Sequence, residues 1–94
     1  MRVHVNTSDQ GLPLQETFTG NTAEEVVGAI KKRVTQELPF ALRLAANTMS
    51  NLAFAQEIVR RYNKAQKRNL PLPASCEDFL RMAQEQGIAQ IEKE

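Results

Sequence analysis

The chain opens with two short segments in which apolar and polar residues alternate. In residues 1–6 every odd position is apolar and every even position is polar, which is the period of a half-buried β-strand. Residues 14–19 alternate as well, although Glu16 interrupts their apolar face and therefore suits a strand near a sheet edge. Gly11 lies between the two segments and can adopt the positive φ that a hairpin bulge needs. This pattern predicts an N-terminal β-hairpin.

From residue 20 onward the spacing of apolar residues changes to that of an α-helix. Thr22 followed by Glu25 is a capping-box pair, which marks the start of a helix. The apolar residues that follow share one helical stripe, namely Val26, Val27, Ile30, Val34 and Leu38. Pro39 then ends or kinks this helix, because proline has no backbone N–H to donate. Two strands alone are marginally stable, so we expect this helix to pack against the hairpin.

The next segment, FALRLAANTM at residues 40–49, is apolar on nearly every side when it is placed on a helix. Arg43 is its only charged residue. Such a segment is either central core or a surface that contacts a partner. We favour the second interpretation and expect a homodimer or the docking of a larger protein partner. The residues that we expect to make this contact are Phe40, Leu42, Leu44 and Met49.

A third helix is predicted to begin after Thr48 or Ser50, because either residue can act as its N-cap. The apolar stripe of this helix comprises Leu52, Ala55, Ile58, Val59, Tyr62 and Ala65. The pattern leaves open whether residues 40–68 form one helix or two. A continuous helix over residues 40–67 would reach about 42 Å, which is longer than a globule of this size is wide. Asn47, together with Thr48 and Ser50, favours a break.

The last quarter of the chain predicts one more helix and a final short strand. Pro71 and Pro73 end the third helix, and Ser75 can cap a fourth. The expected inner face of the fourth helix comprises Cys76, Phe79, Leu80 and Ala83. Gly87 suits the position just after the helix, where a left-handed residue is favoured. Residues 88–91 can then add a short strand beside the hairpin.

These elements predict a single small α+β domain over residues 1–94, in which an N-terminal β-hairpin packs on three to four helices. A short C-terminal third strand is an addition that the pattern permits. The composition, with 41% hydrophobic and 24% charged residues, is ordinary for a globular protein and so agrees with this fold class. The core residues that we expect are Val3, Val5, Phe18, Val27, Ile30, Val34, Ile58, Val59, Tyr62, Phe79 and Leu80.

The residue types that carry catalysis or bind metals are sparse. His4 is the only histidine and Cys76 the only cysteine, and neither has the spacing of a metal ligand. We interpret His4 as a residue on the polar face of the first strand. We interpret Cys76 as a packing residue, because the charges of Glu77 and Asp78 oppose ionisation of its thiol. The sequence therefore predicts no catalytic residue, no metal site and no cofactor, and it indicates no small-molecule substrate; we do not expect an enzyme.

Cysteine usage and hydropathy bear on the location of the protein. A single cysteine excludes an internal disulfide. The N-terminus lacks the apolar core of a signal peptide, and the longest apolar stretch is too short to cross a bilayer. We therefore expect a cytoplasmic protein without a membrane partner.

The net charge of +1 conceals a basic middle between two acidic ends, because residues 39–68 carry six cations and one anion. The cations of the segment RRYNKAQKRN are expected on the helix face opposite the apolar stripe, and they are Arg60, Arg61, Lys64, Lys67 and Arg68. One interpretation is a solvated face on which Glu57 pairs with the first two. The other is a nucleic-acid (polyanion) surface, to which Asn63 could add a hydrogen bond. An acidic protein partner is a third interpretation.

Taken together, the pattern favours a non-catalytic small interaction or regulatory/accessory protein that acts through protein–protein contacts. The alternative is a nucleic-acid-binding module that uses the basic face of residues 60–68. A pull-down with and without nuclease treatment distinguishes these two classes.

Overall fold

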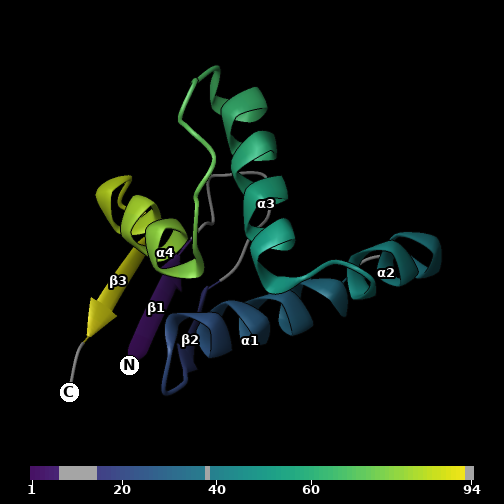
Figure 1. Cartoon of the computed structure of the whole chain (residues 1–94), viewed down its shortest axis with the longest axis horizontal. Helices are drawn as coiled ribbons and strands as arrows, with labels where there is room; N and C mark the ends of the chain where they lie inside the picture. The colour runs from purple at the N-terminus through teal and green to yellow at the C-terminus, as the bar shows by residue number, and fades with distance from the viewer. Residues whose placement is uncertain (7–14, 38, 93–94) are drawn as a thin grey trace.

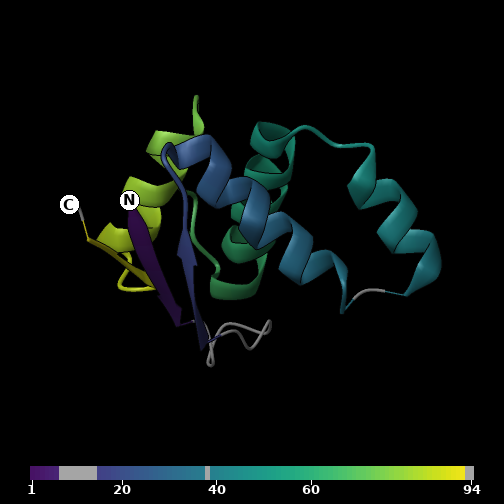
Figure 2. The same ribbon diagram turned by 90° about the horizontal axis from the view of Figure 1, so that it is seen from below.

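The computed structural model describes residues 1–6, 15–37 and 39–92, and within these ranges the predicted α+β fold is confirmed. Figures 1 and 2 show the strands gathered at one end of the molecule and the second helix at the other. The elements in chain order are β1 (Arg2–Asn6), β2 (Gln15–Thr19), α1 (Ala23–Thr35), α2 (Phe40–Asn47), α3 (Asn51–Gln66), α4 (Cys76–Glu85) and β3 (Ala89–Glu92).

The three strands form one antiparallel sheet in the order β2-β1-β3, so the expected third strand is present and pairs with β1. Val3 lies opposite Phe18 on one side and Ile91 on the other, which places it at the centre of the sheet, fully buried. The strand β2 is an edge strand, as the position of Glu16 predicted. The carboxylate of Glu16 accepts a hydrogen bond from Arg33 of α1 at 3.0 Å. The expected turn at Gly11 lies outside the described residues.

Side chains that cap helix ends divide the helical part of the chain much as the sequence predicted. Thr22 accepts a hydrogen bond from the backbone N–H of Glu25 at the start of α1. That helix ends at Thr35, four residues before Pro39, which serves as the N-cap position of α2. Ser50 accepts from the N–H of Ala53 and thereby starts α3. The single continuous helix considered above is therefore wrong, because the chain leaves the helical conformation between α2 and α3.

The end of α4 returns the chain to the sheet. Gly87 has a φ of +76°, the left-handed conformation predicted for it. Its N–H donates to the carbonyl of Gln84, and the N–H of Ile88 donates to the carbonyl of Ala83. These two bonds form a Schellman motif, which satisfies carbonyls at the helix end and reverses the chain. The strand β3 can therefore run antiparallel to β1 immediately after the helix.

The core lies around α1, whose Val26 and Val27 are both completely buried. Its buried residues are Val3, Phe18, Ala23, Val26, Val27, Ile30, Val34, Phe54, Ala55, Val59, Cys76, Phe79, Leu80 and Ala89. Among the residues expected in the core, Val5, Ile58 and Tyr62 are half-buried and the others are buried. Phe54 was not expected there. It is buried because α3 packs against both α1 and α4, so a wider arc of this helix is covered.

Gly28 lies in the interior of α1, where a glycine lowers helix stability, but it also has a role in packing. A β-carbon at this position would lie 3.1 Å from the side-chain nitrogen of Asn51, the first residue of α3. That nitrogen donates to the carbonyl of Glu24 at 3.2 Å. The small residue thus allows the start of α3 to approach α1 closely.

Two phenylalanine truncations should separate core packing from surface exposure. Phe79 is 8% exposed and Phe40 is 72% exposed. Phe79→Ala should lower the free energy of unfolding by about 3–5 kcal/mol, because it removes a buried ring and leaves a cavity. Phe40→Ala should change it by no more than about 0.5 kcal/mol. Urea denaturation of the two variants measures both values, and equal destabilisation would contradict this core.

Candidate functional site

The helix α2 presents large apolar side chains to solvent. Phe40 is 72% exposed, Leu42 49% and Leu44 53%, so three of the four expected contact residues lie on the surface. Met49 differs from them because it is half-buried after the end of the helix. Its carbonyl accepts a hydrogen bond of 2.7 Å from the ammonium of Lys31 on α1. Met49 therefore helps to fix α2 to the body of the protein.

The helix α2 differs from an ordinary surface helix in how little of its apolar surface it buries. Ala46 is its only buried residue. Arg43 and Asn47, which are both exposed, line a cavity of about 310 Å³ between α2 and α1, together with polar residues such as Lys32 and Thr35. An amphipathic surface helix usually turns its apolar side to the core. In α2 only the small Ala46 is buried, and the three large apolar side chains, Phe40, Leu42 and Leu44, are all exposed.

This helix has little local support. It has eight residues, no side-chain cap at its N-terminus and no acidic residue in its first turn. Helices of this length are marginal in isolation. Its alanines and leucines favour the helical state, but packing must supply the remainder of its stability. The helix α2 packs against α1, at the end of the molecule far from the sheet (Figure 2).

The basic residues of α3 are all exposed, as expected, but they do not form one continuous helical stripe. Glu57 pairs with Arg60 at 3.2 Å and with Arg61 at 3.3 Å, which confirms the predicted ion pairs. The helix ends at Gln66, and Lys67 adopts a left-handed conformation with φ of 52°. Lys67 and Arg68 therefore leave the helical face.

Asn63, considered above as a group that reads nucleic acid, is engaged within the protein. Its side-chain nitrogen donates to the carbonyl of Leu70, and its side-chain oxygen accepts from the N–H of the same residue, both at 3.0 Å. This pair fixes the loop after α3. The expected contribution of Asn63 to a nucleic-acid surface is therefore corrected: its hydrogen-bonding groups already stabilise this turn.

A groove that the sequence did not predict lies between α3 and α4. It has a volume of about 320 Å³, and its walls come from α1, α3, α4, the loop at Leu70 and the adjoining strands. Apolar side chains dominate its walls, among them Val34, Ile58, Met82 and Ala83. The polar residues that line it are Arg61, Tyr62 and Gln86. The hydroxyl of Tyr62 donates to the side-chain oxygen of Gln86 at 3.4 Å.

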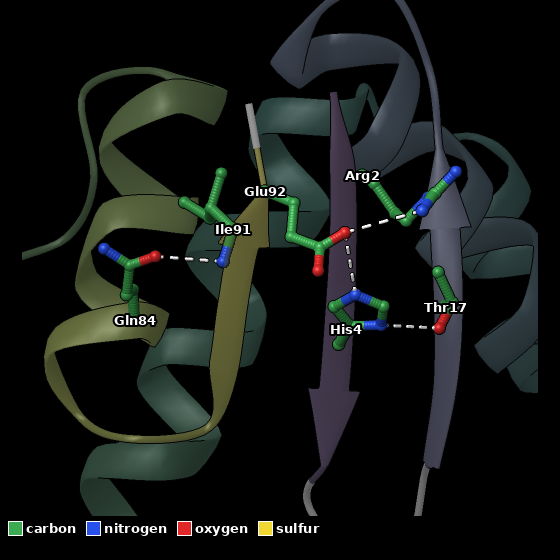
Figure 3. Close-up of polar contacts among 6 residues, drawn as sticks. All are labelled: Arg2, His4, Thr17, Gln84, Ile91 and Glu92. Atoms are coloured by element: carbon green, nitrogen blue, oxygen red, sulfur yellow. Dashed lines mark hydrogen bonds and ion pairs between the residues drawn. The ribbon is translucent and has the colours of Figure 1, made fainter. Parts of the chain in front are cut away.

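His4 lies on the outer face of the sheet in a row of polar groups (Figure 3). Its Nδ1 is 2.8 Å from the hydroxyl of Thr17, and its Nε2 is 3.3 Å from the carboxylate of Glu92, which also pairs with Arg2. Hydroxyl, imidazole and carboxylate thus stand in the order of a catalytic triad. Neither the groove nor the cavity beside α2 is lined by these residues, so neither of them would bring a substrate to this row.

Cys76 is buried at the start of α4, as its place on the expected inner face predicted. Burial raises the pKa of its thiol above the ordinary value of 9.0, and the charge of Glu24 raises it further. A nucleophilic cysteine needs the opposite shift. Among the described residues there is also no group of three or more His, Cys, Asp or Glu side chains that could hold a metal ion.

Comparisons with known proteins give no family for this chain: no family model, no curated protein and no solved structure matches it significantly. Within residues 1–6, 15–37 and 39–92, no helix is long and apolar enough to cross a membrane.

The thiol of Cys76 should be slow to react in the folded protein. At about pH 8, below the ordinary thiol pKa of 9.0, iodoacetamide should alkylate the native chain far more slowly than the urea-unfolded chain. A raised pKa in the folded state stabilises the fold below pH 9.0, and this contribution is lost as the pH rises through the folded-state pKa. Mass spectrometry of quenched samples gives both rates; equal rates would contradict a buried, un-ionised thiol.

Proposed function

We propose that this protein is a non-catalytic interaction module that docks on a partner protein through α2. The observation that carries the proposal is the exposure of all three large apolar side chains of this helix, Phe40, Leu42 and Leu44, while only the small Ala46 is buried. Large apolar side chains exposed together on one short helix cost free energy in water and are typical of protein–protein contact sites. Aromatic side chains at the centre of an interface often contribute most of its binding energy, so Phe40 is the expected anchor.

The charges beside α2 favour a partner with acidic groups around its own apolar site. Lys32 of α1 is exposed beside α2, and α2 itself has no acidic residue. A twofold homodimer would bring the same patch of both copies together, and with it both sets of cations. A different protein with a carboxylate rim would gain from the same charges. We therefore place a distinct protein partner first and the homodimer second.

A nucleic-acid-binding function is the second candidate, and the exposure of the five cations at residues 60–68 supports it. Arg60 and Arg61 share one carboxylate, so their charge is partly compensated. Lys64, Lys67 and Arg68 extend the basic surface beyond that pair. Contacts of such side chains with phosphates would position a nucleic acid without reading its sequence.

We place this module in the cytoplasm. A single cysteine that is buried as a free thiol suits a reducing compartment, where disulfides are rare.

A carboxylate introduced into the apolar side of α2 should abolish docking and leave the fold intact. Leu42→Glu should abolish capture of the partner from a lysate of the source cells, because docking would bury a charge without a counter-charge. Leu72→Glu is the matched control, since Leu72 is a similarly exposed leucine, at 42%, outside α2. Thermal melting should be unchanged in both variants. Sedimentation of the purified protein shows whether a second copy is the partner, and capture that survives Leu42→Glu contradicts the proposal.

Nucleic-acid binding makes a different prediction. Labelled duplex DNA should bind at about 50 mM salt with a Kd below about 100 μM, and log affinity should fall with log salt at a slope of roughly −4 if four or five phosphates are contacted. Arg60→Glu combined with Lys64→Glu should weaken binding to all sequences alike. Fluorescence polarisation measures both effects. Failure to bind DNA or RNA under these conditions would leave the face as a solvated helix surface.

A further inference from the structure

The groove between α3 and α4 is a second candidate binding site, and it is separate from α2. No side chain of the described residues fills its volume of about 320 Å³, although its walls are largely the apolar residues that a core would use. Protein interiors are normally packed without spaces of this size. A preformed apolar cavity with a few polar groups at one side is the usual architecture of a small-molecule site.

The size of the groove indicates what kind of occupant it can accept. Its volume falls at the lower end of the range of ligand cavities, about 300–1,000 Å³. A docked helix or protein domain would need a total buried surface of about 1,200 Å² or more for a stable contact. The groove therefore suits the apolar body of a small molecule better than a folded partner.

The polar groups of the groove indicate the charge of that occupant. Arg61 and the hydroxyl of Tyr62 come from successive residues of α3, and both line the groove. Lys64 is exposed one turn further along the same helix, and no carboxylate lines the groove among the described residues. Glu57 also pairs with Arg60, so it would keep a counter-charge if Arg61 turned toward a bound anion.

We propose that this groove binds a small amphipathic organic carboxylate, with the apolar body between α3 and α4 and the carboxylate at Arg61. Apolar burial supplies most of the binding free energy, and the guanidinium fixes the orientation of the head group. Sequence patterns gave no sign of such a ligand, because the walls come from segments that are distant along the chain.

Decanoate and the uncharged analogue decanol, each titrated calorimetrically below its aggregation limit, test the proposal. Wild-type protein should bind decanoate roughly fivefold more tightly than decanol, the ratio expected of one solvent-exposed charge pair. Arg61→Gln should make the two affinities equal. Arg60→Gln is the matched control, because it removes a cation paired with the same Glu57 but does not line the groove. It should preserve the preference for decanoate.

A filled groove provides the complementary variant. Ala65→Phe places a ring in the space and should abolish binding of both probes; because Ala65 is exposed on the groove wall, the melting temperature should not fall. The proposal is overturned if wild-type protein binds neither probe, if it binds both equally, or if Arg60→Gln and Arg61→Gln have the same effect. It is also overturned if Ala65→Phe folds and still binds, or if an acidic amphipathic peptide binds in the groove and decanoate does not.

Discussion

The burial of α1 between the sheet and the other helices is the constraint on which the remaining structure depends. This helix packs against β2, α2, α3 and α4, and its completely buried Val26 and Val27 lie at the centre of the core. Its apolar arc is therefore used by the sheet, α3 and α4. The side that remains for α2 carries Lys31, Lys32 and Thr35, which is polar. Because of this, α2 cannot bury Phe40 or Leu44 against its neighbour, and both side chains stay exposed.

Sequence reasoning succeeded where the determining interactions are local. The caps at Thr22, Ser50 and Ser75 each depend on a side chain and a backbone N–H three residues later, so the residues alone indicate them. The left-handed Gly87 is likewise a local requirement of a helix end. These features mark where the helices begin and end. The strand β3 could be predicted because the turn at Gly87 directs the chain back toward the sheet.

The orientation of α2 and the groove could not be derived in the same way, because both depend on which faces of distant elements meet. Leu42 is exposed because the side of α1 that faces α2 is polar. The residues around Leu42 do not predict this exposure, because they are equally consistent with a buried core helix. The groove needs Val34, Ile58 and Ala83 to stand around one space, and each of them reads in the sequence as ordinary core. The basic segment was predicted as a single stripe, because nothing in its composition indicates that Lys67 would take a left-handed conformation.

The row of Thr17, His4 and Glu92 shows that the presence of suitable residue types is not enough to indicate catalysis, because their surroundings also decide what they can do. The order of groups matches a nucleophile, a base and an orienting carboxylate, yet all three lie on the outer sheet face, where cross-strand pairing already accounts for them. His4 lies directly opposite Thr17, and Arg2 lies opposite Glu92, so these contacts tie β1 to both neighbouring strands. Catalysis would further require a cavity for the substrate and donors for a developing negative charge. The groove between α3 and α4 and the cavity beneath α2 both lie away from these three residues, so neither supplies them with a substrate site.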